Sequence, residues 1–187
     1  MFNRRQFIQA SIALVSTGLA TELRASQGED WREMILKQPR YLWMTRHETG
    51  EEIRATYWTP SAGIQQDGYL SACRLLRDVR AGVAAMMDPR LLDVLCGIQT
   101  WLRIYGYSQP IVATSGYRTK GTNDRTEGAK KNSKHISAQA ADIAIPGVGE
   151  MALAKMAWTF QKGGVGIYPG RKFVHVDTGA IRAWKGF

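Results

Sequence analysis

The sequence predicts an α+β domain in which a small antiparallel sheet packs against helices, preceded by an N-terminal export signal. Three observations carry this prediction. Two arginines and an apolar run open the chain, apolar residues recur with a helical period in its middle, and short apolar segments bounded by Gly and Pro fill its C-terminal half. With 187 residues and 44% hydrophobic content, the chain is long enough for one ordinary domain with a real core.

Residues 1–25 have the pattern of a cleavable export signal. Arg4 and Arg5 precede an apolar stretch at 7–20 that contains no acidic residue, and paired arginines followed closely by a large apolar residue are typical of twin-arginine signals. A stretch of about fourteen residues falls short of the roughly 20 that span a bilayer as a helix, so we expect no permanent membrane span. We predict cleavage near residues 20–25, export by the machinery that carries folded proteins, and a mature domain at 26–187.

The first half of the mature domain is predicted to be a hairpin followed by a helical part. Aromatic and β-branched residues at 41–47 and 52–58 flank a turn, which indicates an edge or cover hairpin at about 40–58. Apolar residues at three- and four-residue spacing then predict a helical part at about 66–106, with helices at 66–81 and 88–106. Each helix carries one cysteine, Cys73 and Cys96, and both a disulfide and two buried thiols are open.

The part at about 110–187 is predicted to carry the functional site. Short apolar runs indicate four strands and a helical period indicates one helix; the strands are 110–116, 140–146, 164–169 and 172–177, and the helix is 149–163. Only a Pro-Gly-Arg turn separates the last two strands, so we expect them to pair as an antiparallel hairpin. The polar segment 118–133 is long for a loop in a compact domain, and loops of this length are commonly functional.

The charge of the chain raises the question of a nucleic-acid partner. Lys and Arg number 25 against 16 Asp and Glu, and the formal net charge of +9 would attract polyanions. The basic residues are scattered, however, and the densest group, at 129–134, is short. We therefore expect no nucleic-acid binding.

Two of the three histidines lie near carboxylates in segments that can meet. His135 precedes Asp142 by seven residues, and Asp142 lies in a run of small apolar residues. If strands 140–146 and 172–177 pair, Asp142 and His175 can face the same side of the sheet while His135 folds in from the loop. Hydrolytic zinc sites take three ligands from His and carboxylate side chains and leave one position for water. His135, Asp142 and His175 therefore form a candidate site for Zn²⁺.

Three segments resemble the signature blocks of a family of zinc peptidases. These segments are 115-SGYRT-119, 133-SKHISAQAAD-142 and 173-FVHVDTG-179. They are similar to blocks in the group that contains lysostaphin, the D-Ala-D-Ala metallopeptidases and the hedgehog signalling domain, with the closest match to the exported murein endopeptidase K family. The resemblance covers about residues 40–187 in the same order. It implies a zinc-dependent peptidase that acts on the stem peptides of bacterial peptidoglycan, with metal ligands at His135, Asp142 and His175.

The resemblance also implies a substrate-binding role for Arg118. Amide hydrolysis needs positive charge to hold the developing oxyanion, and Arg118 could supply it or grip a substrate carboxylate as a bidentate fork. A structural salt bridge is the alternative for Arg118. Ser115 and Tyr168 are the further residues that we expect to contact substrate.

The general base is where this chain departs from its better-understood relatives, which carry a glutamate three residues before the last ligand. Lys172 occupies that position here. Asp177 follows His175 by two residues and so points to the same face of a strand, which makes it the candidate base. An alternative exchanges the roles, with Asp177 binding the metal and His175 serving the chemistry. Glu127 could act if the long loop closes over substrate.

Two classes of function follow from these expectations. The first is a periplasmic zinc endopeptidase or carboxypeptidase that cuts peptidoglycan cross-links. The second is a catalytically inactive, metal-stabilised module of the same fold that binds peptidoglycan. A metal site with an open position beside Arg118 favours the enzyme, whereas a closed site with four protein ligands favours the module. The sequence leaves open which cross-link is cut.

Overall fold

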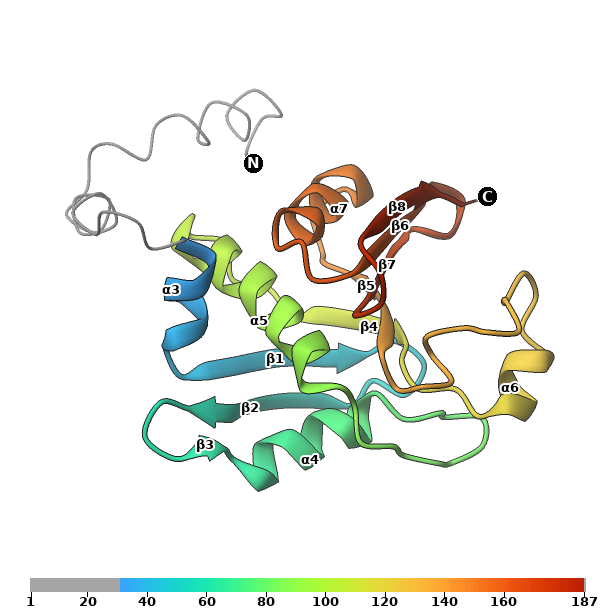
Figure 1. Ribbon diagram of the computed structural model, residues 1–187, viewed down its shortest axis with the longest axis horizontal. Coiled ribbons are helices and arrows are strands. Elements are labelled where there is room, and N and C mark those ends of the chain that lie inside the picture. The colour runs from blue at the N-terminus through green and yellow to red at the C-terminus, as the bar shows by residue number, and fades with distance from the viewer. Residues whose placement is uncertain (1–30, 187) are drawn as a thin grey trace. The chain divides into compact units, whose positions relative to one another are not determined.

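The computed structural model describes residues 31–186, and within this range the strands form one mixed sheet (Figure 1). The sheet has eight strands in the order β3-β2-β1-β4-β5-β7-β6-β8. The strands are β1 (Arg40–Arg46), β2 (Glu52–Thr59), β3 (Gly63–Ile64), β4 (Ile111–Ser115), β5 (Ala140–Ala144), β6 (Gly164–Tyr168), β7 (Phe173–Asp177) and β8 (Arg182–Lys185). All of them belong to the unit Leu36–Phe187; a second unit, Met1–Ile35, is described only from residue 31, where helix α3 (Trp31–Lys37) begins.

The predicted export signal at 1–25 lies outside the described residues, so it stays a prediction. None of the helices in the described part of the chain is long and apolar enough to cross a membrane.

The predicted small antiparallel sheet is wrong in size and in direction. The strands pair antiparallel except at two places, where β1 runs parallel to β4 and β6 runs parallel to β8. The hairpin at 40–58 is part of the main sheet, because β1 pairs with β2 on one side and with β4 on the other. β1 and β4 are parallel, since the helical part between β2 and β4 returns the chain beside β1 in the same direction. β8 was not expected at all. The predicted antiparallel pairing of the last two strands is confirmed by the ladder between β6 and β7.

The predicted helices are present with shorter bounds. They are α4 (Gln66–Leu75), α5 (Pro89–Ile104) and α7 (Glu150–Thr159), and a fourth helix, α6 (Lys120–Asp124), forms inside the segment predicted as a loop. The first predicted helix extended to residue 81, but the chain turns earlier because Asp78 pairs with Val83 across a bend and its carboxylate accepts a hydrogen bond from the amide of Ala81. Thr119 caps α6, since its hydroxyl accepts a hydrogen bond from the amide of Thr122.

The core lies between the sheet and three of these helices, and α4 packs against β2 and β1. α5 packs against β1 and against α7, and α7 packs against β6 and β7 (Figure 1). The apolar face of α5 is fully buried at Leu91, Leu95 and Ile98. Cys73 and Cys96 are both buried with free thiols, which answers the question that the sequence left open.

Candidate metal centre

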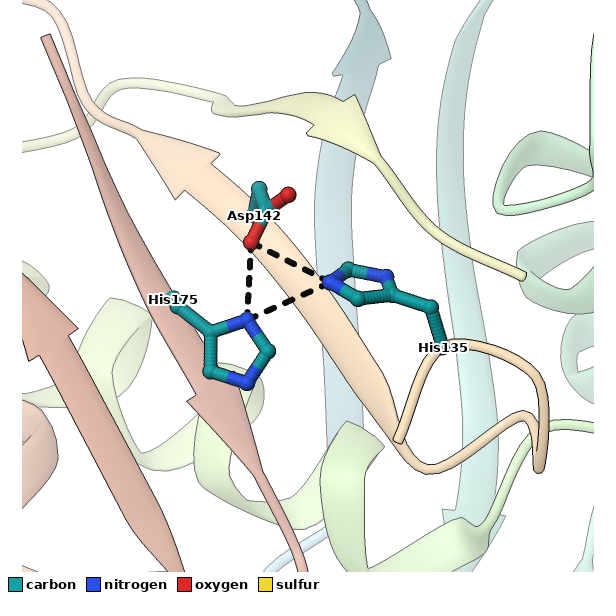
Figure 2. Close-up of side chains that lie close together, drawn as sticks. All are labelled: His135, Asp142 and His175. Atoms are coloured by element: carbon teal, nitrogen blue, oxygen red, sulfur yellow. Dashed lines mark hydrogen bonds and ion pairs between the residues drawn. The ribbon is translucent and has the colours of Figure 1, made fainter. Parts of the chain in front are cut away.

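Three central strands place side chains of the candidate site in one row. Asp142 on β5 is paired with Ser115 on β4 on one side and with His175 on β7 on the other. The predicted pairing of the segments that carry Asp142 and His175 is therefore confirmed, and adjacent positions in an antiparallel ladder bring their side chains together. His135 reaches the same place from the loop before β5 (Figure 2).

The three predicted ligands converge on a small volume. One ligand atom from each of His135, Asp142 and His175 lies within 4.8 Å of the others. Nε2 of His135 is 3.3 Å from Oδ1 of Asp142, and Nδ1 of His175 is 2.9 Å from the same oxygen (Figure 2). All three residues are buried. Two imidazole nitrogens and one carboxylate oxygen thus face a common centre away from bulk water.

Each of these residues is held through its remaining polar atom. Nδ1 of His135 lies 2.6 Å from the carbonyl oxygen of Gly116, so that nitrogen carries the proton and Nε2 presents its lone pair. Arg118 donates from Nη2 to Oδ2 of Asp142 at 2.7 Å, which leaves Oδ1 directed at the histidines. This donor set fits a divalent metal ion, because ligating side chains are usually oriented by such outer contacts.

The electrostatics of the site follow from its burial. Burial opposes ionisation of Asp142, but the two histidines outweigh it and hold the pKa of the carboxyl well below its usual range. Burial lowers the pKa of His135 despite Asp142 beside it. Asp142 is therefore ionised and His135 neutral near neutral pH, and these are the forms that bind a metal.

Asp177 lies on the outer side of His175, away from the point where the ligand atoms meet. Its Oδ2 is 3.0 Å from Nε2 of His175, whereas Nδ1 of the same ring faces Asp142. Among the described residues, the group that could hold a metal contains His135, Asp142 and His175, and Asp177 is not a member.

Arg118 and Ser115 lie together in the wall of a cleft beside the three ligands. Nε of Arg118 donates to Oγ of Ser115 at 2.9 Å, so the side chain is fixed by Ser115 and Asp142 at once. Both residues and Asp142 line the cleft, which has a volume of about 350 Å³ and falls within the usual range for ligand pockets. The ion pair considered as the alternative for Arg118 is present, and its partner is a residue of the candidate metal site.

The remaining predicted residues lie outside the cleft lining. The hydroxyl of Tyr168 accepts a hydrogen bond from the indole of Trp184, and Tyr168 stacks on Phe173, which itself lines the cleft. Glu127 and Lys172 are exposed and do not line the cleft.

Three cleft-lining residues come from the hairpin, where the sequence suggested no site. Arg46, His47 and Glu48 lie at the end of β1 and reach the cleft because β1 runs parallel to β4, whose last residue is Ser115. No local signal in the sequence reports this pairing. The third histidine of the chain, His47, is therefore also beside the candidate site.

The fold is α+β, and its mixed sheet carries a buried His-Asp-His set beside an arginine-lined cleft. This is the arrangement of a metallopeptidase. The family model for the peptidoglycan L,D-endopeptidase MepK matches residues 35–184, and the chain belongs to this family. The resemblance to the murein endopeptidase K family is thereby confirmed.

Relatives from two organisms agree with the family model. The peptidoglycan L,D-endopeptidase MepK of Escherichia coli (strain K12) is 36% identical over 151 residues, which cover 79% of this chain and 81% of the relative. The protein of Haemophilus influenzae (strain Rd) named "Probable peptidoglycan L,D-endopeptidase MepK" is 34% identical over 153 residues, which cover 80% of this chain and 81% of the relative. The family model thus covers most of the described residues, and the chain is a metallopeptidase.

Proposed function

We propose that this protein is a zinc-dependent endopeptidase that hydrolyses L,D peptide cross-links of peptidoglycan in the cell envelope. The observation that carries the proposal is the convergence of His135, Asp142 and His175, each with one free ligand atom. The names of the relatives, which are L,D-endopeptidases of peptidoglycan, support the substrate and the bond. A peptidoglycan substrate agrees with an exported, periplasmic protein, and the twin-arginine pattern at 1–25 supports export in the folded state.

Zinc is the metal that the donor set favours. Two imidazoles and one carboxylate make the His₂-carboxylate set of catalytic zinc sites, which leave a position open. A zinc ion bound there supplies a Lewis acid that polarises an amide carbonyl and makes water nucleophilic near neutral pH. Among the described residues, the candidate site has three ligands. Catalytic zinc sites have three protein ligands and structural sites have four, so this number supports an enzyme over a metal-stabilised binding module.

The side chains around the site have separate roles in this proposal. Arg118 fixes Asp142 through Nη2, and its Nη1, which neither Ser115 nor Asp142 engages, can donate to the oxygen that gains charge during amide hydrolysis. His175 is a metal ligand through Nδ1. The contacts of Asp177 support a positioning role, in which it holds the ring of His175, in place of the general-base role expected from the sequence.

The test uses purified protein without residues 1–25, with its metal content measured. With zinc bound, the protein is incubated with cross-linked peptidoglycan, and the released muropeptides are identified by mass spectrometry. We expect cleavage of L,D cross-links, and loss of both zinc binding and cleavage in His135→Ala. Glu127→Gln is the control, because Glu127 is exposed and lies outside the cleft lining. Intact cross-links after incubation with the zinc-loaded protein would refute the proposal.

A further inference from the structure

The cleft beside the candidate metal site contains a buried arginine with unused hydrogen-bond donors. Arg46 is 4% exposed, and its Nη2 donates to Oε2 of Glu48 at 2.8 Å. Its Nε and Nη1 are buried and find no hydrogen-bond partner among the residues that the structure describes. A buried charged donor without a partner is unfavourable, and in folded proteins a water molecule, an ion or a bound ligand satisfies such a group.

Further positive charge gathers around Arg46. Four arginines line the same cleft: Arg46, Arg80, Arg118 and Arg171. Burial lowers the pKa of Arg118, and the charges of Arg80 and Arg46 lower it further against the opposing effect of Asp142. These guanidinium groups therefore lie within electrostatic reach of one another, and the cleft favours an anion between them.

The carboxylates of the cleft are already engaged by the protein. Glu48, Asp78 and Asp142 are the three acids in its lining. Asp78 accepts hydrogen bonds from the backbone amide of Thr119 at 2.9 Å and from its hydroxyl, and Asp142 belongs to the candidate metal site. Of these three acids, Glu48 pairs with Arg46, and it accepts a hydrogen bond from one of the three guanidinium nitrogens, Nη2. The cleft therefore keeps a positive excess that an incoming anion can neutralise.

We propose that Arg46 and the exposed Arg80, beside the charge of Arg118, form a subsite for a free carboxylate of the substrate next to the amide that is cut. The inference rests on the proposed function, because it names what the cleft recognises in a peptidoglycan cross-link. Guanidinium groups bind carboxylates through charge-assisted hydrogen bonds, and a carboxamide in the same place carries no charge for them to bind. The subsite makes the enzyme selective for the free acid over the amide.

Two synthetic cross-linked peptide dimers test the subsite. They differ only in whether the carboxyl group nearest the scissile amide is free or is a carboxamide. We expect the zinc-loaded wild type to cleave the free-acid dimer with a kcat/KM about 10- to 100-fold higher, the size of effect that a charge-assisted hydrogen bond to a buried group produces. Arg46→Gln should lose that advantage by slowing on the free-acid dimer alone. Arg80→Gln, which removes an exposed charge, should reduce it only partly.

Arg77→Gln is the matched control, since Arg77 pairs with Glu51 of the same hairpin but lies outside the cleft lining. It should leave the selectivity unchanged. Equal cleavage of both dimers by the wild type overturns the subsite and leaves the endopeptidase intact, whereas cleavage of neither dimer refutes the endopeptidase and the subsite with it. An equal loss on both dimers in Arg46→Gln shows a structural role and also overturns the inference. If Arg46→Gln does not fold, the wild type and Arg80→Gln decide.

Discussion

Oδ2 of Asp177 lies 3.0 Å from Nε2 of His175, and the same carboxylate pairs with both terminal nitrogens of Arg182. Two backbone amides donate to its other oxygen, and its side chain has no exposed surface. Burial opposes the ionisation of Asp177, but His175 and Arg182 outweigh it and hold its pKa well below the usual range. The result is a fixed anion that orients the imidazole through the nitrogen that does not face Asp142.

Asp177→Asn should therefore weaken metal binding while preserving the shape of the side chain. An amide cannot supply the negative charge that holds Arg182 and the ring of His175, so we expect zinc affinity and kcat/KM to fall about 10- to 100-fold. Competition with a chelator measures the affinity. Asp124→Asn is the control, because Asp124 is exposed and pairs with Lys120 on its own helix. Zinc affinity equal to that of the wild type would exclude the positioning role.

Asp88 links the start of α5 to the segment after β7, and its charge should support folding. Its carboxylate accepts hydrogen bonds from the amide of Arg90 at 3.0 Å and from the hydroxyl of Thr178 at 2.8 Å. Burial opposes the shift, but the guanidinium of Arg90, the Thr178 hydroxyl and the Arg90 amide outweigh it and lower the pKa of Asp88 from 3.8 to about 2. Because the folded state has the lower pKa, the stabilisation is present above the unfolded value and is lost as the pH falls toward about 2.

Asparagine still caps a helix, so Asp88→Asn removes only the charge; we expect it to lower the free energy of unfolding by about 1 kcal/mol near neutral pH, the size of a charge interaction at a helix N-terminus. The difference from the wild type should shrink as the pH falls through the interval between the two pKa values. Urea denaturation at a series of pH values measures it, with Asp124→Asn as a surface control. A difference that is constant over this interval would show that the charge of Asp88 does not contribute.

The part of the site that could be predicted from the sequence lies within short spacings. The period of two along a strand places His175 and Asp177 on one face. The run of small residues around Asp142 indicated a buried strand, in which a cation could neutralise the carboxylate of Asp142. The sequence could not show which nitrogen of His175 each carboxylate contacts. The contacts of the two nitrogens depend on the rotation of the His175 ring. Asp177 fixes this rotation, and Arg182, on the unpredicted strand β8, holds Asp177 in place.

The missed part depends on pairing between distant segments. Arg46 and His47 reach the cleft because β1 lies parallel to β4, and a helical part of the chain separates these strands. Local periodicity shows that a segment is a strand but carries no information about its neighbour. β8 escaped prediction because it has only four residues, three of them exposed, without the alternation that marks a half-buried strand.

The two cysteines should be unreactive in the folded protein. Cys73 and Cys96 are buried with free thiols, and burial raises the pKa of both, so little thiolate is present near neutral pH. We expect a thiol reagent to modify neither in native buffer and both in denaturant, as counted by mass spectrometry. Ser61→Cys, at an exposed position, provides a thiol that should react at once. A mass two hydrogens short, with no thiol to titrate in denaturant, would indicate a disulfide instead.

Gly166 on β6 lets the indole of Trp184 lie beside His175. A Cβ at Gly166 would collide with the ring of Trp184, whose centroid is 5.3 Å from that of the His175 ring. Gly166→Ala should therefore lower the free energy of unfolding by about 1–3 kcal/mol through overpacking. In a Trp184→Ala background the clash is gone, and the same change should have much less effect. Gly170→Ala is the control, because a Cβ there meets nothing within 4 Å. Urea denaturation of the single and double variants measures the coupling, and equal losses in both backgrounds would rule out the proposed contact.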